Sequence, residues 1–355
     1  MSKMKFGLIG CGRIARRHAE VIGSIEQAEL VAVCDVVRDR VKSFGERYGV
    51  RWYVSAEEML EKEDVQVANV LTPSGTHSEV VLQIAGKVPN IVVEKPMALR
   101  LDDADEMIGK CDLSQTRLFV VKQNRFNLPV LKLREALQKG RFGKFVLGTV
   151  RVRWTRKQEY YDEDSWRGTW AMDGGVFANQ ASHHVDLLVW MMGEVESVMA
   201  MTAIRLVNIE TEDTGVVLLR FRKGALGVIE ATTATRPRDL EGSISILGEN
   251  GTVEIGGFAV NEMKVWNFAT PQEGDSEVLE RYRTNPPDVY GFGHHSYIKD
   301  VIDCIREGRK ALVDGLEGRK SLELINAIYE SVETGKEVFL RFKPQRSRLG
   351  VKNHG

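Results

Sequence analysis

The pattern of apolar and polar positions changes once along the chain. In the first part, short apolar runs alternate with amphipathic stretches of helical length, which predicts βαβ units and a parallel sheet. An amphipathic helix over 38–49 closes at Gly49, and another runs from the first glycine turn to about residue 22. The predicted strands of this part are 5–10, 28–35, 67–73, 90–96 and 117–124.

Beyond Gly143 the apolar residues recur at every second position. In "FVLGTVRVRW", Val150 and Val152 fall on one face, and Arg151 and Arg153 fall on the other. This alternation predicts an antiparallel sheet with one face that needs cover.

Two hairpins are predicted in this second part, with turns at Lys223–Gly224 and Asn250–Gly251. Helices are expected over 179–193, 294–308 and 317–334.

The whole pattern predicts an α/β Rossmann domain followed by an α+β domain with an open, mostly antiparallel sheet. A chain of 355 residues is also long for a single core. We expect the first domain at 1–124, the second at 125–343 and a frayed basic tail at 344–355. A C-terminal helix that packs back on the Rossmann domain is compatible with this division.

Composition narrows the function. The chain is 43% hydrophobic and 28% charged with a net charge of -1, which indicates a globular protein and favours neither a nucleic-acid nor a membrane partner. No apolar run approaches the roughly 20 residues of a membrane span. The four cysteines are scattered without a CxxC pair, which suits a reducing cytoplasm.

A glycine turn follows the first predicted strand. Gly10 permits the tight turn, Gly12 lets the backbone approach a pyrophosphate, and Ala15 allows close packing of helix on strand. Asp35 ends the second strand, where a carboxylate binds ribose hydroxyls and repels a 2′-phosphate. The pattern favours NAD over NADP, although Arg38 lies nearby. The alternative is a Rossmann-shaped domain with another ligand.

Two further motifs end later strands. Thr72 and Pro73 in "LTPSGTH" are expected beside the cofactor, and His77 either joins them or only starts a helix. Lys95 in "NIVVEKP" is either a solvated strand end or a group that holds a substrate oxygen. We favour the second interpretation because the strand is apolar and ends at Pro96, whose peptide bond is a candidate for the cis form.

These motifs, together with "GGVFANQASHHVD", resemble the glucose–fructose oxidoreductase/inositol dehydrogenase/MocA family over about residues 1–343. The resemblance implies that the first domain binds NAD(P) and that the second binds substrate and builds the oligomer. It implies Lys95 and His183 as the catalytic residues, with the histidine as acid/base. Many members carry aspartate where this chain has Asn179, so Asp186 is a candidate to orient His183 instead; packing is the other reading of Asp186.

Segments such as "FVVKQNRFN" and "VYGFGHHSYIKDVI" resemble one branch of the family more closely. That branch oxidises the C3 hydroxyl of UDP-N-acetylglucosaminuronic acid in bacterial polysaccharide synthesis, holds NAD(H) tightly and is tetrameric. The resemblance therefore implies a nucleotide-sugar substrate and a homotetramer. Another sugar or inositol dehydrogenase, a noncatalytic NAD(H) sensor, and a hydrolase or lyase with transient use of the cofactor are the alternatives.

The residues expected to bind cofactor or substrate follow from these motifs and the resemblance. The cofactor-binding residues are Gly10, Gly12, Arg13, Ile14, Asp35, Thr72, Pro73, His77, Glu94, Lys95, Gln123, Trp166 and Arg167. The substrate-binding residues are Lys95, Arg125, Tyr161, Asn179, His183 and Asn208. Further candidates for the diphosphate and the uracil are Arg153, Arg156, Arg167 and Tyr160.

Several of these residues keep a second interpretation. Arg167 is either a cofactor contact or part of a structural ion pair, and Tyr160 and Tyr161 either stack on uracil or pack at an interface. Lys95 itself is a candidate base if its pKa falls. No metal is expected, because the pairs His183–His184 and His294–His295 lack ligand spacing.

Overall fold

The computed structural model describes residues 2–283, 292–340 and 349–350. The chain forms two compact units. Unit 1 comprises Met1–Lys122 and His294–Arg319, and unit 2 comprises Gln123–Gly293 and Lys320–Gly355. Residues 294–319, which fall within the range expected for the second domain, belong to unit 1, and they contain a helix that packs back on the Rossmann domain as the sequence analysis allowed.

Unit 1 contains a six-stranded sheet in the order β3-β2-β1-β4-β5-β6, and every neighbouring pair is parallel. The strands β2 and β3 are added on one side of β1, and β4, β5 and β6 are added on its other side, so the strand order reverses between β1 and β4. Ligands of such sheets bind at this switch point, at the carboxyl ends of the strands. The strands are β1 Met4–Ile9, β2 Ala28–Cys34, β3 Arg51–Tyr53, β4 Val67–Val70, β5 Asn90–Val93 and β6 Arg117–Val120.

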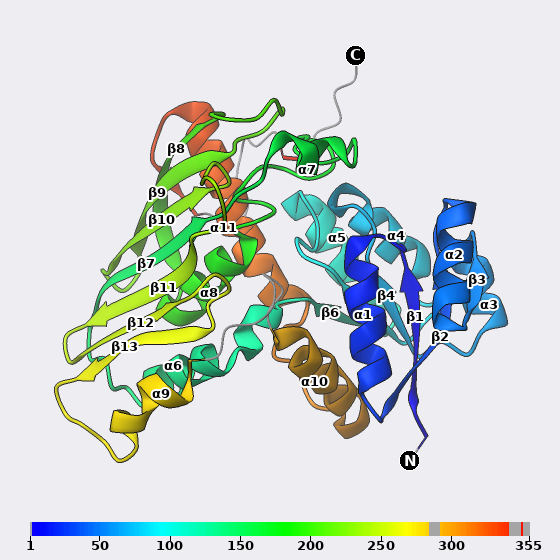
Figure 1. Cartoon of the computed structure of the whole chain (residues 1–355), viewed down its shortest axis with the longest axis horizontal. Helices are drawn as coiled ribbons and strands as arrows, with labels where there is room; N and C mark the ends of the chain where they lie inside the picture. Colours follow the sequence, from blue (N-terminus) through cyan, green and yellow to red (C-terminus); the bar gives the residue numbers. More distant parts are fainter. Residues whose placement is uncertain (1, 284–291, 341–348, 351–355) are drawn as a thin grey trace. The chain divides into compact units, whose positions relative to one another are not determined.

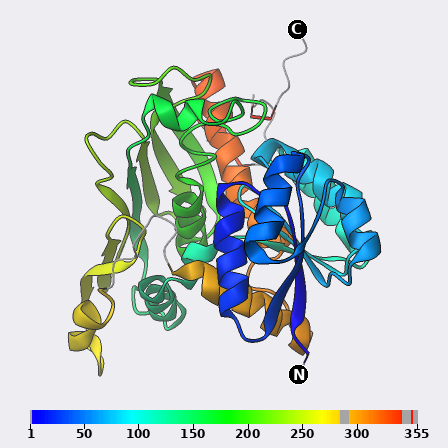
Figure 2. The same ribbon diagram turned by 45° about the vertical axis from the view of Figure 1, so that its right-hand side comes forward.

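The helices of unit 1 follow the predicted pattern. The helix α2 ends at Gly49, whose φ of 65° is left-handed as the sequence predicted. Figures 1 and 2 show the parallel sheet with its helices (blue to cyan). The helices are α1 Arg13–Ser24, α2 Arg38–Tyr48, α3 Ala56–Lys62, η1 Ser74–Thr76, α4 His77–Ile84, α5 Leu101–Leu113, α10 Gly293–Glu307 and the first turn of α11 Gly315–Thr334.

Hydrogen bonds explain why residues 294–319 belong to unit 1. Arg117 in β6 donates to the carbonyls of Cys304 at 2.9 Å and Arg309 at 2.6 Å. Arg319 donates to Asp105 of α5 at 2.5 Å. These bonds join segments that are about two hundred residues apart in the chain, so no local pattern could have predicted them.

Unit 2 contains an eight-stranded sheet in the order β13-β12-β11-β7-β10-β9-β8-β14. The pair β7–β10 is parallel and the other described pairs are antiparallel, as expected for a mostly antiparallel sheet. The strands are β7 Phe145–Arg153, β8 Val195–Ala203, β9 Thr214–Phe221, β10 Leu226–Thr232, β11 Glu241–Gly248, β12 Gly251–Gly256, β13 Glu262–Phe268 and β14 Val338–Phe339.

One face of this sheet is covered by α8. A Cβ on Gly148 of β7 would meet Leu188 and Met192 of α8 at 2.9 Å, so the glycine permits close contact. Among the described elements of unit 2, none of the helices lies on the opposite face (Figures 1 and 2). The helices of unit 2 are η2 Gln123–Phe126, α6 Leu128–Gln138, α7 Gln158–Asp162, α8 Ser182–Met192, η3 Asp275–Glu277, α9 Val278–Arg281 and the rest of α11.

Both predicted hairpins are present. β9 pairs with β10 around Gly224, and β11 pairs with β12 directly after Asn250. The predicted frayed tail is wrong at Leu349 and Gly350: Leu349 is 1% exposed, and the amide of Gly350 donates to the carbonyl of Trp170 at 2.6 Å. The other residues of 344–355 lie outside the described part of the chain.

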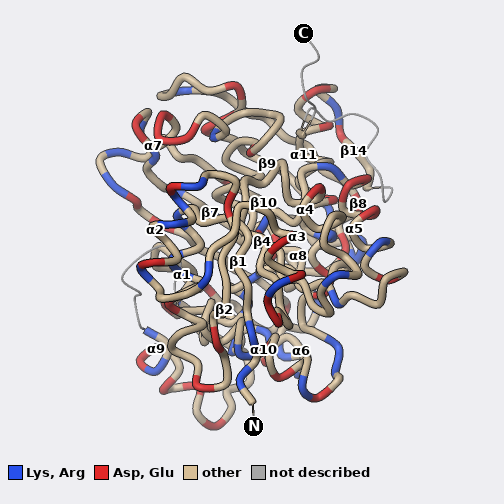
Figure 3. Tube along the Cα trace, turned by 90° about the vertical axis from the view of Figure 1, so that its right-hand side faces the viewer, with Lys and Arg blue, Asp and Glu red and all other residues tan. Residues whose placement is uncertain are grey.

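Charges of both signs are spread over both units, in keeping with the net charge of -1 (Figure 3). None of the described helices combines the length and the apolar character that a membrane crossing requires.

His184 generates a prediction about stability. It is fully buried against Trp154, neither of its ring nitrogens has a hydrogen-bond partner among the described residues, and burial lowers its pKa to about 3. The neutral ring therefore stabilises the fold fully above pH 6.5, and this contribution is lost as the pH falls from 6.5 towards 3, by at most about 1.4 kcal/mol per pH unit. His184→Phe should flatten the pH dependence of the urea midpoint in this range, whereas His295→Phe at an exposed position should not. An unchanged slope in His184→Phe would contradict this assignment.

Candidate functional site

The glycine turn lies where β1 and β4 end side by side. Gly10 has a φ of 96°, and a Cβ at this position would come within 2.8 Å of the backbone of Leu71 and 2.9 Å of that of Thr72. Gly12 caps α1, and a Cβ there would meet nothing within 4 Å. The turn is therefore closed on the sheet side and open above Gly12.

The first turn of α1 suits an anion. Its N-cap supplies no side-chain hydrogen bond, and the turn carries no acidic residue. Arg13 and Ile14 are its first two residues. A helix N-terminus of this kind binds phosphate through backbone N–H groups and the helix dipole.

Asp35 lies beside the same turn and is 6% exposed. Its carboxylate accepts hydrogen bonds from the amides of Cys11 and Val37, both at 2.8 Å. Arg40 lies 3.4 Å from the carboxylate, whereas the guanidinium of Arg38 stacks over Trp52. These contacts hold the Asp35 carboxylate in place at the end of β2.

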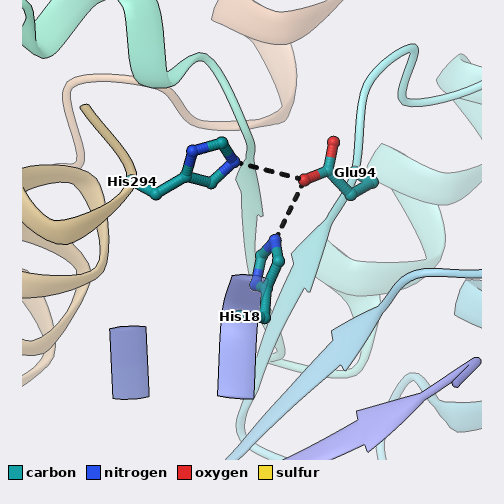
Figure 4. Close-up of side chains that lie close together, drawn as sticks. All are labelled: His18, Glu94 and His294. Atoms are coloured by element: carbon teal, nitrogen blue, oxygen red, sulfur yellow. Dashed lines mark hydrogen bonds and ion pairs between the residues drawn. The ribbon is translucent and has the colours of Figure 1, made fainter. Parts of the chain in front are cut away.

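Glu94 is a buried carboxylate with several partners in unit 1 (Figure 4). One oxygen, Oε1, lies 2.9 Å from Nε2 of His18 in α1 and 3.9 Å from Nε2 of His294 in α10. The other, Oε2, accepts the backbone N–H of Lys95 at 2.9 Å. Burial opposes ionisation, but the two histidines outweigh it and hold the pKa of Glu94 well below its usual range.

The same three side chains have the composition of a metal site, and their ligand atoms lie within 4.8 Å of one another. Hydrogen bonding accounts for the cluster. The Nδ2 of Asn69 donates to Nδ1 of His18 at 2.9 Å, so that Nε2 of His18 carries the proton and donates to Glu94. A protonated nitrogen is not a metal ligand, and we assign no ion to the cluster.

Lys95 and His77 lie on the loop after β5 and at the start of α4. The peptide bond between Lys95 and Pro96 is cis. The ring of His77 lies between two carbonyls, with Nδ1 2.8 Å from that of Pro96 and Nε2 2.9 Å from that of Thr72. His77 is the first residue of α4, as its second interpretation expected, and it joins the loops after β4 and β5.

His183 lies in the first turn of α8 in unit 2. Its Nε2 lies 2.9 Å from Nε2 of Gln123 in η2, and both residues are buried. One turn further on, Asp186 accepts two hydrogen bonds from Arg125, at 2.7 and 2.9 Å. Two side-chain contacts therefore link η2 to α8.

Arg125 and Asp186 thus have each other as partners. Both are almost fully buried, and the guanidinium also stacks over Trp190 at 4.8 Å. A guanidinium neutralised in this way has little to offer a diphosphate. We leave Arg125 out of the proposed substrate contacts, and the packing interpretation of Asp186 fits its geometry.

The segment before α8 is held by buried acids. Asp173 accepts from Nδ2 of Asn179 at 2.6 Å and from the amide of Gly168 at 2.8 Å. Glu212 accepts from the amide of Phe177 at 3.1 Å and from the hydroxyl of Tyr329 at 2.9 Å. Burial raises the pKa of Glu212 to about 7. These bonds fix the residues that lead to His183.

The remaining candidates cluster around α7. Arg167 pairs with Glu163 at 2.9 Å and Asp164 at 2.7 Å, and it covers the ring of Tyr160, so its structural interpretation is realised here. Tyr161 is buried, and its hydroxyl bonds Thr233 at 3.2 Å.

Of the remaining residues expected to bind cofactor or substrate, Trp166 and Asn208 are more open to solvent. Arg153 and Arg156 each form an ion pair within the chain. Trp166 is half-buried, and Asn208 is exposed with its backbone paired to the side chain of Gln158. Arg153 pairs with Glu230 on the uncovered face of the sheet, and Arg156 pairs with Asp239.

Sequence reasoning did not find the residues behind the motifs. His18 lies on α1 and Asn69 lies on β4. Asp173 lies in the segment before α8, and Glu212 bonds that segment from another part of the chain. His18, Asn69 and Glu212 act through partners far away in the chain, whereas Asp173 bonds residues five and six positions away. Asn69 is a single polar residue in an apolar strand and Asp173 precedes two glycines, but His18 and Glu212 stand among other polar residues and give no such signal.

The features of unit 1 fit a bound dinucleotide: a glycine turn that is open above Gly12, an uncapped helix N-terminus, and a fixed Asp35 at the switch point of the sheet. They define the class of dinucleotide-binding Rossmann proteins. Comparison with known proteins names the family. The oxidoreductase family's NAD-binding Rossmann fold matches residues 4–122, and its C-terminal alpha/beta domain matches residues 134–340. The chain belongs to this Gfo/Idh/MocA oxidoreductase family and is an NAD-dependent enzyme.

Relatives within the family differ in substrate. The WlbA dehydrogenase of Bordetella pertussis, solved with NADH and UDP-GlcNAcA, is 45% identical with a TM-score of 0.92, covering 96% of this chain and 98% of that one. The WlbA enzyme of Chromobacterium violaceum, solved with the same two molecules, is 45% identical with a TM-score of 0.90 over 96% and 97%. The myo-inositol 2-dehydrogenase of Thermotoga maritima is 33% identical over 95% of this chain and 98% of its own length.

The Glu94 cluster generates a prediction. In Glu94→Gln, an amide N–H faces either His18 or the Lys95 amide, both of which are donors, and we expect a loss of about 1–3 kcal/mol in the free energy of unfolding at pH 7. The pKa of Glu94 is lowered in the folded state, so its stabilising effect is present above the unfolded value of 4.5 and is lost as the pH falls further. Urea unfolding should therefore show that wild type and variant converge in acid. Glu79→Gln on the exposed face of α4 is the control, and a constant difference between wild type and Glu94→Gln at all pH values would contradict the account.

Asp35 generates a second prediction. Asp35→Ala removes the ribose acceptor and the partner of two backbone amides, so NAD+ affinity should fall by about tenfold or more, at least 1.4 kcal/mol. Calorimetric titration of nucleotide-free protein measures this affinity. Asp39→Ala, in the exposed first turn of α2, should bind NAD+ like the wild type. An unchanged affinity in Asp35→Ala would remove Asp35 from the cofactor site.

Proposed function

We propose that this enzyme oxidises the C3 hydroxyl of UDP-N-acetylglucosaminuronic acid to a ketone, with NAD+ as the hydride acceptor. The proposal rests above all on one observation: the two WlbA dehydrogenases solved with UDP-GlcNAcA are each 45% identical over 96% of this chain. The identity to the myo-inositol enzyme is lower, at 33%. A role in the synthesis of a cell-surface polysaccharide is part of the same proposal.

The proposed chemistry requires two groups beside the bound NAD+, which supplies the hydride acceptor. His183 is the proposed base, because the ordinary pKa of an imidazole lies near the working pH, and such catalysis contributes about 10²–10⁴-fold. Lys95 is the proposed donor to the reacting oxygen and stabilises its developing negative charge. The buried Glu94 accepts the backbone N–H of Lys95 and thereby fixes the start of the loop that carries this side chain.

The substrate contacts that we propose are Lys95, His183, Asn179, Tyr161 and Asn208. Asn179 has the clearest support, because Asp173 holds its side chain four residues before His183. An amide in that place donates and accepts hydrogen bonds with sugar hydroxyls without adding charge. Tyr161 and Asn208 are carried by the resemblance alone.

A second candidate function is oxidation of an inositol or a free sugar. It is favoured by the 33% identity to the myo-inositol 2-dehydrogenase over nearly the whole of both chains. A free polyol has no diphosphate and no carboxylate, so it needs fewer cationic partners. The guanidinium groups of Arg125 and Arg167 are engaged by carboxylates of this chain, which is compatible with such a substrate.

We also propose a cytoplasmic homotetramer in which the uncovered sheet face of one copy meets that of a second copy. Support comes from exposed apolar side chains on neighbouring strands of that face: Met201 at 76%, Leu218 at 58%, Leu226 at 50% and Val216 at 48%. Patches of this kind mark interaction surfaces. The four cysteines are free and buried, which suits a reducing compartment.

Single-turnover absorbance at 340 nm tests the proposed function. The nucleotide released from denatured protein is identified first, and NAD+ is then restored to full occupancy. On mixing with UDP-N-acetylglucosaminuronic acid, absorbance should rise in proportion to active sites. A rise with myo-inositol or a free aldose but not with the nucleotide sugar would establish the second candidate instead. No rise with any of them would favour a noncatalytic NAD(H)-binding role.

The same trace tests the two proposed catalytic groups. Lys95→Met and His183→Phe should each reduce the rate by at least about 10²-fold while leaving NAD+ binding intact. Asn208→Ala, at an exposed loop, tests a substrate contact and should raise KM with little change in kcat. A rate within tenfold of wild type in either catalytic variant would remove that residue from the mechanism.

A further inference from the structure

Leu349 is a buried residue in the polar and basic stretch 343–355. Its side chain is only 1% exposed and lies against Gly174, in the segment before α8: a Cβ added to Gly174 would come within 2.7 Å of Cδ1 of Leu349. The amide of the next residue, Gly350, donates to the carbonyl of Trp170 at 2.6 Å. An apolar contact and a backbone hydrogen bond therefore hold these two residues, which we call the Leu349 wedge, against the segment before α8.

The same segment has a further partner in Tyr329 of α11. The hydroxyl of Tyr329 accepts from the amide of Gly175 at 3.1 Å, and its ring packs edge-on against the ring of Trp170, with 5.3 Å between centroids. Gly174 has a φ of 82°, and a Cβ there would come within 3.5 Å of the Tyr329 hydroxyl. The glycine therefore lets both Tyr329 and Leu349 approach the backbone of this segment closely.

Asp173 lies inside the held segment, between the two residues that the wedge contacts. Its carboxylate is buried and accepts from Nδ2 of Asn179 at 2.6 Å and from the amide of Gly168 at 2.8 Å. Because a carboxylate only accepts, the bond to Asp173 sets which end of the Asn179 carboxamide faces it. Close-packed interiors transmit small displacements, so a shift of the segment would move the carboxylate and the carboxamide of Asn179 with it.

We propose that the Leu349 wedge positions Asn179 for the substrate, by fixing the segment from which Asp173 holds the Asn179 carboxamide. The inference rests on the proposed function, in which Asn179 contacts the sugar. The wedge acts through Asp173 and Asn179, so Leu349 and Gly350 are positioning residues and not catalytic ones. A site built on a segment before a helix needs such support, because a group that is held loosely loses much of its effect.

The location of the wedge predicts which step it affects. The Leu349 wedge, Asp173 and Asn179 belong to unit 2, whereas the glycine turn and Asp35 belong to unit 1. Loss of the wedge should therefore weaken the use of the sugar and leave the affinity for NAD+ unchanged. A misplaced Asn179 costs about one hydrogen bond to the sugar, which corresponds to a roughly threefold to tenfold higher half-saturating sugar concentration.

The first experiment measures this concentration from single-turnover rates at 340 nm with UDP-N-acetylglucosaminuronic acid. Leu349→Ala should raise it by about threefold to tenfold with little change in the maximal rate. Leu349→Met keeps the volume of the side chain and should restore nearly the wild-type value. Leu113→Ala removes a leucine that is 87% exposed at the end of α5 and should change nothing. Calorimetric titration should give all these variants the wild-type affinity for NAD+.

A double-mutant cycle separates positioning from a general loss of stability. If the wedge acts through Asn179, the variant with both Leu349→Ala and Asn179→Ala should have the same half-saturating concentration as Asn179→Ala alone. A purely structural role of Leu349 would instead multiply the two effects.

A matched pair of truncations tests the wedge as a unit. A chain that ends at residue 348 lacks the wedge and should behave like Leu349→Ala, whereas a chain that ends at Gly350 keeps it and should behave like wild type. Leu349→Ala serves as the test if the shorter chain does not fold.

The contact itself is measured without any sugar. Protein labelled with 5-fluorotryptophan is examined by ¹⁹F NMR, and the Trp170 signal is identified by its loss in Trp170→Phe. We expect this signal to shift in Leu349→Ala and in the chain that ends at residue 348. It should stay in place in Leu113→Ala and in the chain that ends at Gly350.

The two readouts separate the wedge from the proposed substrate. An unshifted Trp170 signal in the variants without the wedge would overturn the contact. A shifted signal with an unchanged half-saturating concentration, or effects that multiply in the double variant, would overturn the positioning of Asn179. If the enzyme oxidises another sugar, the comparison is made with that sugar, and a shifted signal with a raised half-saturating concentration would support the wedge while the proposed substrate is rejected.

Discussion

The buried carboxylate of Glu94 is the constraint on which the cofactor unit depends. An isolated charge in such a place costs several kcal/mol of folding free energy. Polar groups from separate segments of the chain surround the carboxylate and offset this cost. α1 contributes His18, α10 contributes His294, and the chain itself contributes the amide of Lys95. Because these partners must meet at one carboxylate, they fix where α1, β5 and α10 lie relative to one another within unit 1. The start of the loop that carries Lys95 is fixed by the same group.

The second unit uses the same principle with other residues. The buried pair Arg125–Asp186 and the contact Gln123–His183 join a short turn to the first turns of α8. Asp173 and Glu212 hold the glycine-rich segment that precedes α8, where Gly175 leaves room for the Glu212 carboxyl. A catalytic group must be held closely to be effective, and the polar groups of this unit are arranged around His183 and Asn179. The proposed chemistry therefore also relies on buried residues, such as Asp173 and Glu212, that are not among the proposed substrate contacts.

The sequence predicted what depends on local patterns. Short apolar runs predicted β1, β2, β4, β5 and β6, while alternation and turn residues predicted β7 and the hairpins β9–β10 and β11–β12. The glycine turn with Asp35 predicted the dinucleotide fold. All of these signals lie in short continuous segments of the sequence. The family and its cofactor followed from motifs in a fixed order and are confirmed by the comparisons. The sequence did not predict that Arg125 pairs with Asp186 or that His18 and His294 share Glu94. Each of these depends on a partner at least sixty residues away, and a polar residue does not reveal its partner in the sequence.

The central claim is that this enzyme removes a hydride from C3 of a UDP-linked uronic acid. The most direct measurement uses UDP-N-acetylglucosaminuronic acid with deuterium at C3 of the sugar and protein filled with unlabelled NAD+. After one turnover the nucleotide is released and analysed by mass spectrometry. The account predicts NADH that carries the deuterium, in proportion to active sites. NADH without deuterium, or nucleotide that remains entirely NAD+, would contradict it.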